Sequence, residues 1–268
     1  MNTLKQFKIT ALLGTMVALF AWGCGTGTDS GTGTMQVKMH DNPGDYDEVN
    51  ISVERVEVNR SEGDEGWQTI SEPNETYNIL ELINGEFEVL ADAELETGTY
   101  QQIRLILSDN NTVVVDGETF NMTVPSGAET GLKLNINAEI TEGIVYVLLL
   151  DFDADRSVRE RGAADGYNLV PVVRATAEAI TGNISGTISP AEARAMITAE
   201  VGDEIVSTTY ADEETGEFTL VGLEDDSYTI TVEAREDGYE SEERDNVEVT
   251  IGEVTNLGEI VLSESAEE

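Results

Sequence analysis

VNISVERVEV, residues 49–58, is the stretch that decides the fold. Every second residue from Val49 to Val53 is apolar, which is the pattern of a strand with one buried face. Val56 and Val58 continue the alternation one position out of phase, as a β-bulge between the two halves would require. The stretch therefore predicts one long, bulged strand whose apolar side lies against a core.

The residues around this stretch continue the β pattern. RSEGDEG (60–66) predicts a hairpin connection into a strand that begins at Trp67. No run longer than about ten residues keeps a helical apolar period, although 87–95 favours a short turn of helix. We expect the further strands of this first domain at 77–83, 99–107, 112–115, 119–124, 132–136, 144–152 and 170–174.

A second β unit begins near Gly182. The alternation from Tyr228 to Ala234 is regular, and about 80 residues with seven strands is the size of a small Ig-like or transthyretin-like sandwich. We expect its strands at 183–188, 196–201, 205–210, 217–220, 227–234, 246–251 and 255–262. The predicted fold class is all-β, with two β-sandwich domains in tandem: an Ig-like or jelly-roll-like sandwich over 35–178, then a seven-stranded transthyretin-like sandwich over 181–263, followed by a tail at 264–268.

The first 24 residues read as an export signal. A basic start is followed by an apolar run from Ile9 to Trp22, too short for a stable spanning helix. Cys24, the only cysteine, then resembles the lipobox cysteine of bacterial lipoproteins, which is diacylated through its thiol and anchors the protein to a membrane. Ala21 stands where a lipobox usually has Leu, and Trp22 where it has a small residue. Cleavage by ordinary signal peptidase, which would release a soluble protein, is the alternative.

These features divide the N-terminal part of the chain into two segments. We expect a lipoprotein signal peptide over 1–23 and a lipidated Cys24 with a flexible Gly/Thr/Ser tether over 24–34. The expected location is outside the cytoplasm, anchored to the outer membrane or at the cell surface, with the membrane as partner through Cys24.

The charge balance is strongly acidic. Asp and Glu number 54 against 14 Lys and Arg, a formal net charge of -40. The acid is spread along the chain, since residues 35–180 carry 29 acidic and 9 basic side chains and residues 181–268 carry 24 and 3. Molar salt would screen the resulting repulsion, so the composition predicts a halophilic protein, a merely acidic surface protein being the alternative. Nucleic acid is excluded as a natural partner, whereas cations and neutral ligands remain compatible.

The first domain resembles a known family. The segments MQVKMHDNPGDYDEVNISVERVEV, GWQTI, YNILELING, GTYQQIRLILSDNNTVVVDG, VPSGAETGLKLN, LLLDFDADRSV and YNLVPVVRA resemble, in order, the family called domain of unknown function 4382 over residues 33–176. The resemblance implies exported, often lipid-anchored proteins with a β-sandwich and no established activity.

The second domain is similar to another family. ISGTISP, EETGEFTLVGLEDDSYTITVEAREDGY and VEVTIGEVTNLGEIVL look like a carboxypeptidase regulatory-like domain over residues 181–263. Ser227 replaces the usual Gly before Tyr228. The resemblance implies a transthyretin-like, carbohydrate-binding-like fold that commonly serves as a spacer or accessory module, and it implies no sugar site.

Catalytic signatures are absent from the sequence. His40 is the only histidine, no G-x-S-x-G element accompanies it, and a solvated or turn-capping role is expected for it. Zinc sites of the His/Cys type lack ligands, and no nucleotide-binding loop is present. We therefore expect no enzyme and no cofactor, with an enzyme kept only as a remote alternative.

Calcium is the one metal for which the sequence contains candidate ligands. Asp151, Asp153 and Asp155 lie two apart, as oxygen ligands do at the start of a calcium loop. Arg156 stands where an EF-hand has Gly, and Gly162 stands where it has the closing acidic residue. The alternative is that the three carboxylates form the solvent face of a strand. A second acidic run, 41–48, is interpreted as a turn.

Aromatic residues suggest a ligand site of another kind. Trp67, beside a Gly-containing hairpin, with Tyr46 and Tyr77, is the candidate set for stacking against a sugar. Core packing is the competing and commoner role for these rings. The predicted function is a cell-envelope lipoprotein acting as a non-catalytic binding or structural module for carbohydrate. The alternative is a structural or assembly partner of an outer-membrane complex, with envelope proteins as its partners.

Overall fold

The structure, a computed structural model, describes residues 31–62, 65–125, 131–162, 166–202 and 204–265. These residues form strands β1–β20 with only four short helical turns, and the strands build two sandwiches in tandem, which confirms the predicted all-β class. No helix within the described ranges is both long and apolar enough to span a membrane.

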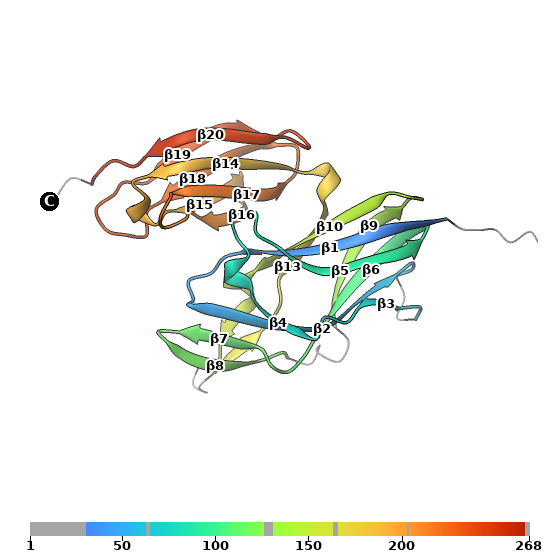
Figure 1. The fold of residues 1–268 in the computed structure, drawn as a ribbon. Coiled ribbons are helices and arrows are strands. Elements are labelled where there is room, and N and C mark those ends of the chain that lie inside the picture. The colour runs from blue at the N-terminus through green and yellow to red at the C-terminus, as the bar shows by residue number, and fades with distance from the viewer. Residues whose placement is uncertain (1–30, 63–64, 126–130, 163–165, 203, 266–268) are drawn as a thin grey trace, which may run out of the picture. The chain divides into compact units, whose positions relative to one another are not determined.

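The first sandwich consists of a four-stranded sheet, in the order β13-β10-β1-β5, and a larger sheet, in the order β11-β12-β8-β7-β2-β6-β9, with β3 and β4 also paired to β2 (Figure 1). Its elements are β1 (Thr32–Asn42), β2 (Glu48–Asn59), β3 (Gln68–Ser71), β4 (Glu75–Asn78), η1 (Ile79–Glu81), β5 (Glu88–Glu96), β6 (Gly98–Leu107), β7 (Thr112–Val115), β8 (Glu118–Thr123), β9 (Leu132–Ile140), β10 (Val145–Asp153), α1 (Ala154–Ser157), β11 (Val158–Glu160), β12 (Tyr167–Leu169), β13 (Val173–Ala177) and η2 (Glu178–Ile180).

Strand β2 organises the larger sheet. Along one side it pairs with β4 and then β3, and along the other side it pairs with β7 and then β6. Its register against β6 shifts between Val53 and Arg55, where the sequence predicts the bulge. The valines before and after the shift are all buried, so the bulge keeps both halves of the strand facing the same core.

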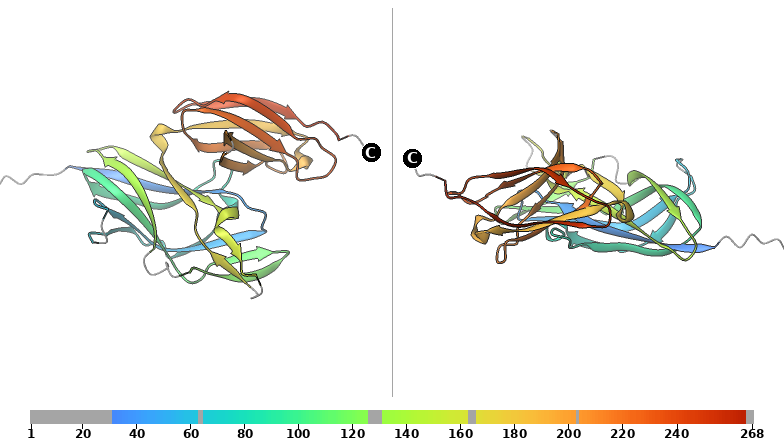
Figure 2. Two further views of the ribbon diagram at one scale, coloured as in Figure 1. Left: turned by 180° about the vertical axis from the view of Figure 1, so that it is seen from behind. Right: turned by 90° about the horizontal axis from the view of Figure 1, so that it is seen from above.

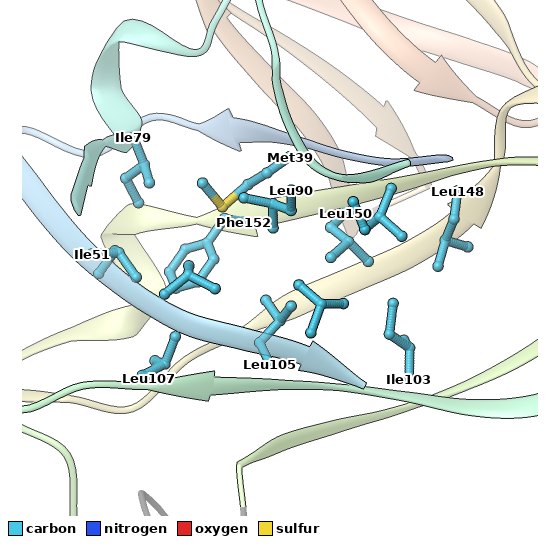
Figure 3. Close-up of a cluster of buried hydrophobic side chains, with 14 of the residues drawn as sticks. Met39, Ile51, Ile79, Leu90, Ile103, Leu105, Leu107, Leu148, Leu150 and Phe152 are labelled. Carbon is cyan, nitrogen blue, oxygen red and sulfur yellow. The ribbon is translucent and has the colours of Figure 1, made fainter. Parts of the chain in front are cut away.

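The core of the first sandwich lies between its two sheets. Leu148, Leu150 and Phe152 on β10 point toward residues of β2 and β6 such as Ile51 and Leu105 (Figure 3). Strand β10 pairs in parallel with β1, whose alternate residues from Met35 to Met39 are also fully buried. Burial of apolar surface in this layer is therefore the main source of stability of the first sandwich.

The second sandwich is smaller and has the predicted seven strands. Its strands appear in gold to red in Figure 2, and its sheets have the orders β17-β14-β20 and β16-β15-β18-β19. Its own buried cluster includes Phe218, Tyr228 and Ile230. Its elements are β14 (Gly182–Ser189), η3 (Ala191–Ala193), β15 (Met196–Val201), β16 (Glu204–Tyr210), β17 (Glu217–Leu223), β18 (Ser227–Glu233), β19 (Glu242–Glu248) and β20 (Val254–Val261).

Three expectations about local structure were wrong. Residues 87–95 form most of strand β5 and not a turn of helix, because Leu90, Ala91 and Leu95 are buried through pairing of β5 with β1. The strand expected at 77–83 ends at Asn78 and is followed by the short helical turn η1. Strand β1 begins at Thr32, inside the stretch expected to be tether, because its first residues pair with the end of β5.

Each sandwich contains a tyrosine that hydrogen-bonds back to the backbone. The Tyr100 hydroxyl donates to the carbonyl of Glu96 at 3.3 Å, and the Tyr228 hydroxyl donates to the carbonyl of Glu224 at 3.0 Å. Both rings are almost fully buried. This arrangement resembles the tyrosine corner that links a strand to its preceding loop in Ig-like sandwiches.

Substituting Tyr228→Phe should remove one hydrogen bond and leave the carbonyl of Glu224 without this donor. We expect the free energy of unfolding of the second sandwich to fall by about 1 kcal/mol. Urea denaturation followed by circular dichroism measures it. Tyr239→Phe is the matched control, because this half-buried ring packs on the same core and its hydroxyl has no hydrogen bond to the described residues. Equal losses in the two variants would contradict the role given to the Tyr228 hydroxyl.

Candidate functional site

The face of the larger sheet that points away from the core carries a row of charged side chains. Cross-strand pairing places Glu57 of β2 between Thr69 of β3 and Arg104 of β6, and Arg104 pairs in turn with Lys133 of β9. Directly paired residues of antiparallel strands lie on one face. We call this surface over β3, β2, β6 and β9 the outer face.

Trp67 lies on the outer face, one residue before β3. Its ring is stacked on Arg104, with the guanidinium carbon 4.2 Å from the ring centroid, and the Lys133 ammonium is 6.0 Å from the same centroid. Cations over an indole face are held by its quadrupole. Arg104 and Lys133 pair across β6 and β9, so both cations contact the ring from the outer face.

The Trp67 indole N–H makes no hydrogen bond. Its nitrogen is buried and has no partner, although the residue as a whole is only half-buried. Buried polar groups normally find partners, so a ring held in this position without one needs an explanation. The polar edge of this ring is therefore turned into the protein and not toward solvent.

An ion network beneath Trp67 holds Arg104 in place. Glu57, only 6% exposed, accepts hydrogen bonds from Arg104, from Arg55 at 3.0 Å and from Thr69 at 3.2 Å. Burial opposes the charged form of Glu57, but the hydrogen bonds from Arg104 and Arg55 outweigh it and hold the pKa of this carboxyl below its usual value. The network thus positions the cation on which the Trp67 ring rests.

Neutral amides lie on the same outer face, in the cross-strand row next to Arg104 and Lys133. The Gln102 amide donates to the Asn135 side-chain oxygen at 2.9 Å, and these two residues pair across β6 and β9. Asn137 follows two residues later on the exposed side of β9. Amides both donate and accept hydrogen bonds, so they can match hydroxyl groups of a ligand without charge.

A groove lies where β9, the edge of the larger sheet, approaches the other sheet. It has a volume of about 560 Å³, and its lining includes Asn135, Ile136 and Asn137 of β9 together with Tyr146 of β10. The Tyr146 ring packs on the core, and its hydroxyl has no hydrogen bond to any described residue. Partial burial raises the pKa of Tyr146, which keeps this hydroxyl a neutral donor and acceptor.

The structure does not bring Trp67, Tyr46 and Tyr77 together. Burial and the nearby Asp155 raise the pKa of Tyr46, which packs near Tyr167 and Arg159 at another part of the sandwich. Burial, with Glu75 and Glu88 close by, raises the pKa of Tyr77 to about 12, and its hydroxyl faces Glu75. The two tyrosines pack against the core, so of the predicted set only Trp67 belongs to the outer face.

The three aspartates predicted to bind calcium have separate surroundings. Asp151 accepts a hydrogen bond from Arg174 at 3.1 Å, Asp153 caps the turn α1 by accepting from the backbone N–H of Arg156, and Asp155 is exposed. Within the described ranges, no group of three or more His, Cys, Asp or Glu side chains could hold a metal ion. Calcium binding by these residues stays a prediction without support from this geometry.

The expectation that His40 is solvated was wrong. His40 is 4% exposed, and its Nδ1 lies 3.8 Å from Asp151, because β1 and β10 pair these two residues in parallel. Burial lowers the pKa of His40 despite the nearby carboxylate, so the imidazole is neutral at neutral pH. Arg174 already engages Asp151, and among described residues no hydroxyl hydrogen-bonds to His40, so a nucleophile for a catalytic triad is not in place.

Asp41, next to His40, is also buried, and no side chain among the described residues donates a hydrogen bond to it. Burial and the neighbouring Asp151 and Asp153 raise its pKa well above the usual value. The acidic run 41–48 therefore includes one carboxyl that belongs to the interior, not only turn residues. Cys24, the predicted lipidation site, lies outside the described residues.

Residue patterns alone did not single out Arg104, Gln102, Asn135 or Tyr146. A weak signal was present in the alternation of polar and apolar residues along LKLNIN (132–137), which assigns the asparagines to an exposed face. That Asn135 shares a face with Arg104 depends on the pairing of β9 with β6, which no local pattern gives.

The family of the chain follows from its first sandwich. The family described as Domain of unknown function (DUF4382) matches residues 32–171, which is more than half of the 268 residues. The chain belongs to this family. No curated protein matches the chain at a significant level.

Several solved structures are distantly similar. The chain shares 21% identity with a type II cohesin–X-dockerin complex from Acetivibrio cellulolyticus over 31% of its own length and 58% of that chain, with a TM-score of 0.24. It shares 14% with the Bacillus anthracis TIE protein over 87% of its length and 34% of that chain, with a TM-score of 0.24. It shares 9% with the shaft pilin SpaA from Lactobacillus rhamnosus GG over 88% of its length and 99% of that chain, with a TM-score of 0.26. Likeness at this level carries no function.

The ion network around Glu57 predicts that the stability of the first sandwich depends on pH. At pH 7, Glu57→Gln should lower the free energy of unfolding by about 1 to 3 kcal/mol, because Arg104 and Arg55 lose their charged acceptor. Since the folded pKa of Glu57 is depressed, its contribution is present above the unfolded value of about 4.3 and is lost as pH falls below it. Urea melts from pH 7 to pH 3 should show the two proteins converging, with exposed Glu139→Gln as the control. A difference that stays constant over this range would contradict the assignment.

Proposed function

We propose that the chain is an exported, lipid-anchored and non-catalytic protein of the cell envelope whose first sandwich binds neutral carbohydrate on the outer face. The observation that carries the proposal is the Trp67 ring, which packs over Arg104 and Lys133 on the outer face that also carries the amides of Gln102 and Asn135. Apolar ring faces flanked by a few placed polar groups are the usual composition of small-ligand sites.

Charge supports a neutral ligand. With a net charge of -40, the protein repels polyanions, and Arg104, whose guanidinium lies over the Trp67 ring, is paired with Glu57. A neutral ligand meets no electrostatic repulsion from the protein and can bind through ring stacking and hydrogen bonds to amides. The second sandwich serves in this proposal as a carboxypeptidase regulatory-like spacer, and the acidity as an adaptation to high salt.

A glycan panel tests the carbohydrate proposal. Residues 25–268, screened in molar salt with and without calcium, should bind one neutral class of glycans saturably. Trp67→Ala should weaken this binding at least tenfold, because it removes the aromatic ring against which the sugar stacks. Trp67→Phe is the conservative control, since it keeps a ring and removes the unpartnered N–H. Tyr77→Ala, which removes a half-buried ring elsewhere, should leave binding unchanged. Failure of the folded protein to bind any glycan would refute the proposal.

The anchor has its own test. Expression of the full chain with radiolabelled palmitate in a bacterial host should label the wild type and leave Cys24→Ser unlabelled, because the thiol is the acylated group. The wild type should fractionate with membranes. Absence of label in both proteins, with release of a soluble form, would show cleavage by ordinary signal peptidase instead.

A structural role through protein contacts is the second candidate function. It rests on β20, an edge strand of the second sandwich with exposed Val254 and Val261 and a single charged residue, Glu259. Exposed edge strands pair readily with other chains. If the glycan panel is negative, chemical cross-linking through β20 becomes the experiment that distinguishes this role.

A further inference from the structure

Building on the proposed function, we infer that the ligand is an extended polysaccharide chain that crosses the outer face from Trp67 and enters the groove at Tyr146. The site would then recognise several consecutive sugar units rather than a single sugar. The inference rests on one feature: β9 contributes both to the outer face and to the wall of the groove.

Asn135 is the residue that joins the two regions. On one side it accepts the hydrogen bond from Gln102, in the cross-strand row next to Arg104 and Trp67. On the other side it lines the groove that also contains Tyr146. Because β9 is the last strand of its sheet, no further strand separates the outer face from the groove.

The dimensions of the path exceed a single sugar. The ring of Trp67 lies over Arg104 on β6, and neighbouring strands are about 4.8 Å apart, so β9 is one step away. Tyr146 belongs to the opposite sheet, and facing sheets lie about 10 Å apart. A ligand that touches both rings must therefore span the edge of the sandwich.

The path carries neutral polar side chains that suit a hydroxylated chain, and the carboxylates of Glu139 and Glu224 also line the groove. Gln102, Asn135 and Asn137 offer amides, and Tyr146 offers a hydroxyl that has no partner among the described residues. Apolar Ile136 and the exposed Ile180 supply surface for the less polar faces of a sugar. The groove volume of about 560 Å³ is within the range of small-ligand sites and is large enough for more than one hydroxylated ring.

Chain-length dependence tests the inference. Isothermal titration of residues 25–268 in molar salt would use mono- to hexasaccharides of β-1,4-linked glucose, β-1,4-linked mannose and α-1,4-linked glucose. We expect affinity for the bound series to rise at least tenfold from disaccharide to hexasaccharide. Tyr146→Ala should remove most of this gain while leaving disaccharide binding unchanged. Tyr146→Phe should remove part of it, and Trp67→Ala should weaken binding at every length.

The outcomes separate this inference from the function on which it rests. Equal affinity for disaccharide and hexasaccharide, with binding still lost in Trp67→Ala, would contradict the extended site. It would leave the proposal that sugar binds at Trp67 intact. An unchanged length dependence in a folded Tyr146→Ala protein would also overturn it. Tyr77→Ala controls for the general effect of deleting a half-buried tyrosine of the same sandwich. Binding of no member of any series by the folded protein would refute the proposed function and the inference together.

Discussion

The bulge in β2 is the constraint on which the first sandwich depends. It shifts the register against β6 between Val53 and Arg55, and it thereby keeps Val56 and Val58 in the core after Val49–Val53. The same shift turns Arg55 and Glu57 toward the outer face, where they support Arg104. One extra residue in one strand therefore determines both the packing of the core and the base of the candidate site.

The surface carboxylates and the buried ion pair of Glu57 differ in how strongly they depend on salt. The many carboxylates of this chain can be screened by salt, whereas the Glu57–Arg104 contact is largely shielded and so depends less on ionic strength. On the outer face, two cations lie over one aromatic ring in a molecule that is otherwise strongly negative. Stability alone does not explain this arrangement, because a buried indole N–H without a hydrogen-bond partner destabilises the folded protein.

Local patterns in the sequence were sufficient for the fold class, the seven strands of the second sandwich and the bulge. They failed for 87–95, where pairing with β1 overrides a weak helical period, and for His40, whose burial comes from the distant strand β10. The candidate site was predictable only in part. Trp67 stood out as a large ring beside a hairpin, but its partners Arg104 and Asn135 come from strands whose register depends on long-range pairing.

The fluorescence of Trp67 tests the central claim most directly. The chain has two tryptophans, and Trp22 precedes Cys24, so residues 25–268 contain Trp67 alone. Titration with the best glycan should change the emission of this tryptophan saturably, with the same dissociation constant that calorimetry gives. Binding detected by calorimetry without any change in Trp67 emission would contradict the account, because the ligand would then lie away from the outer face.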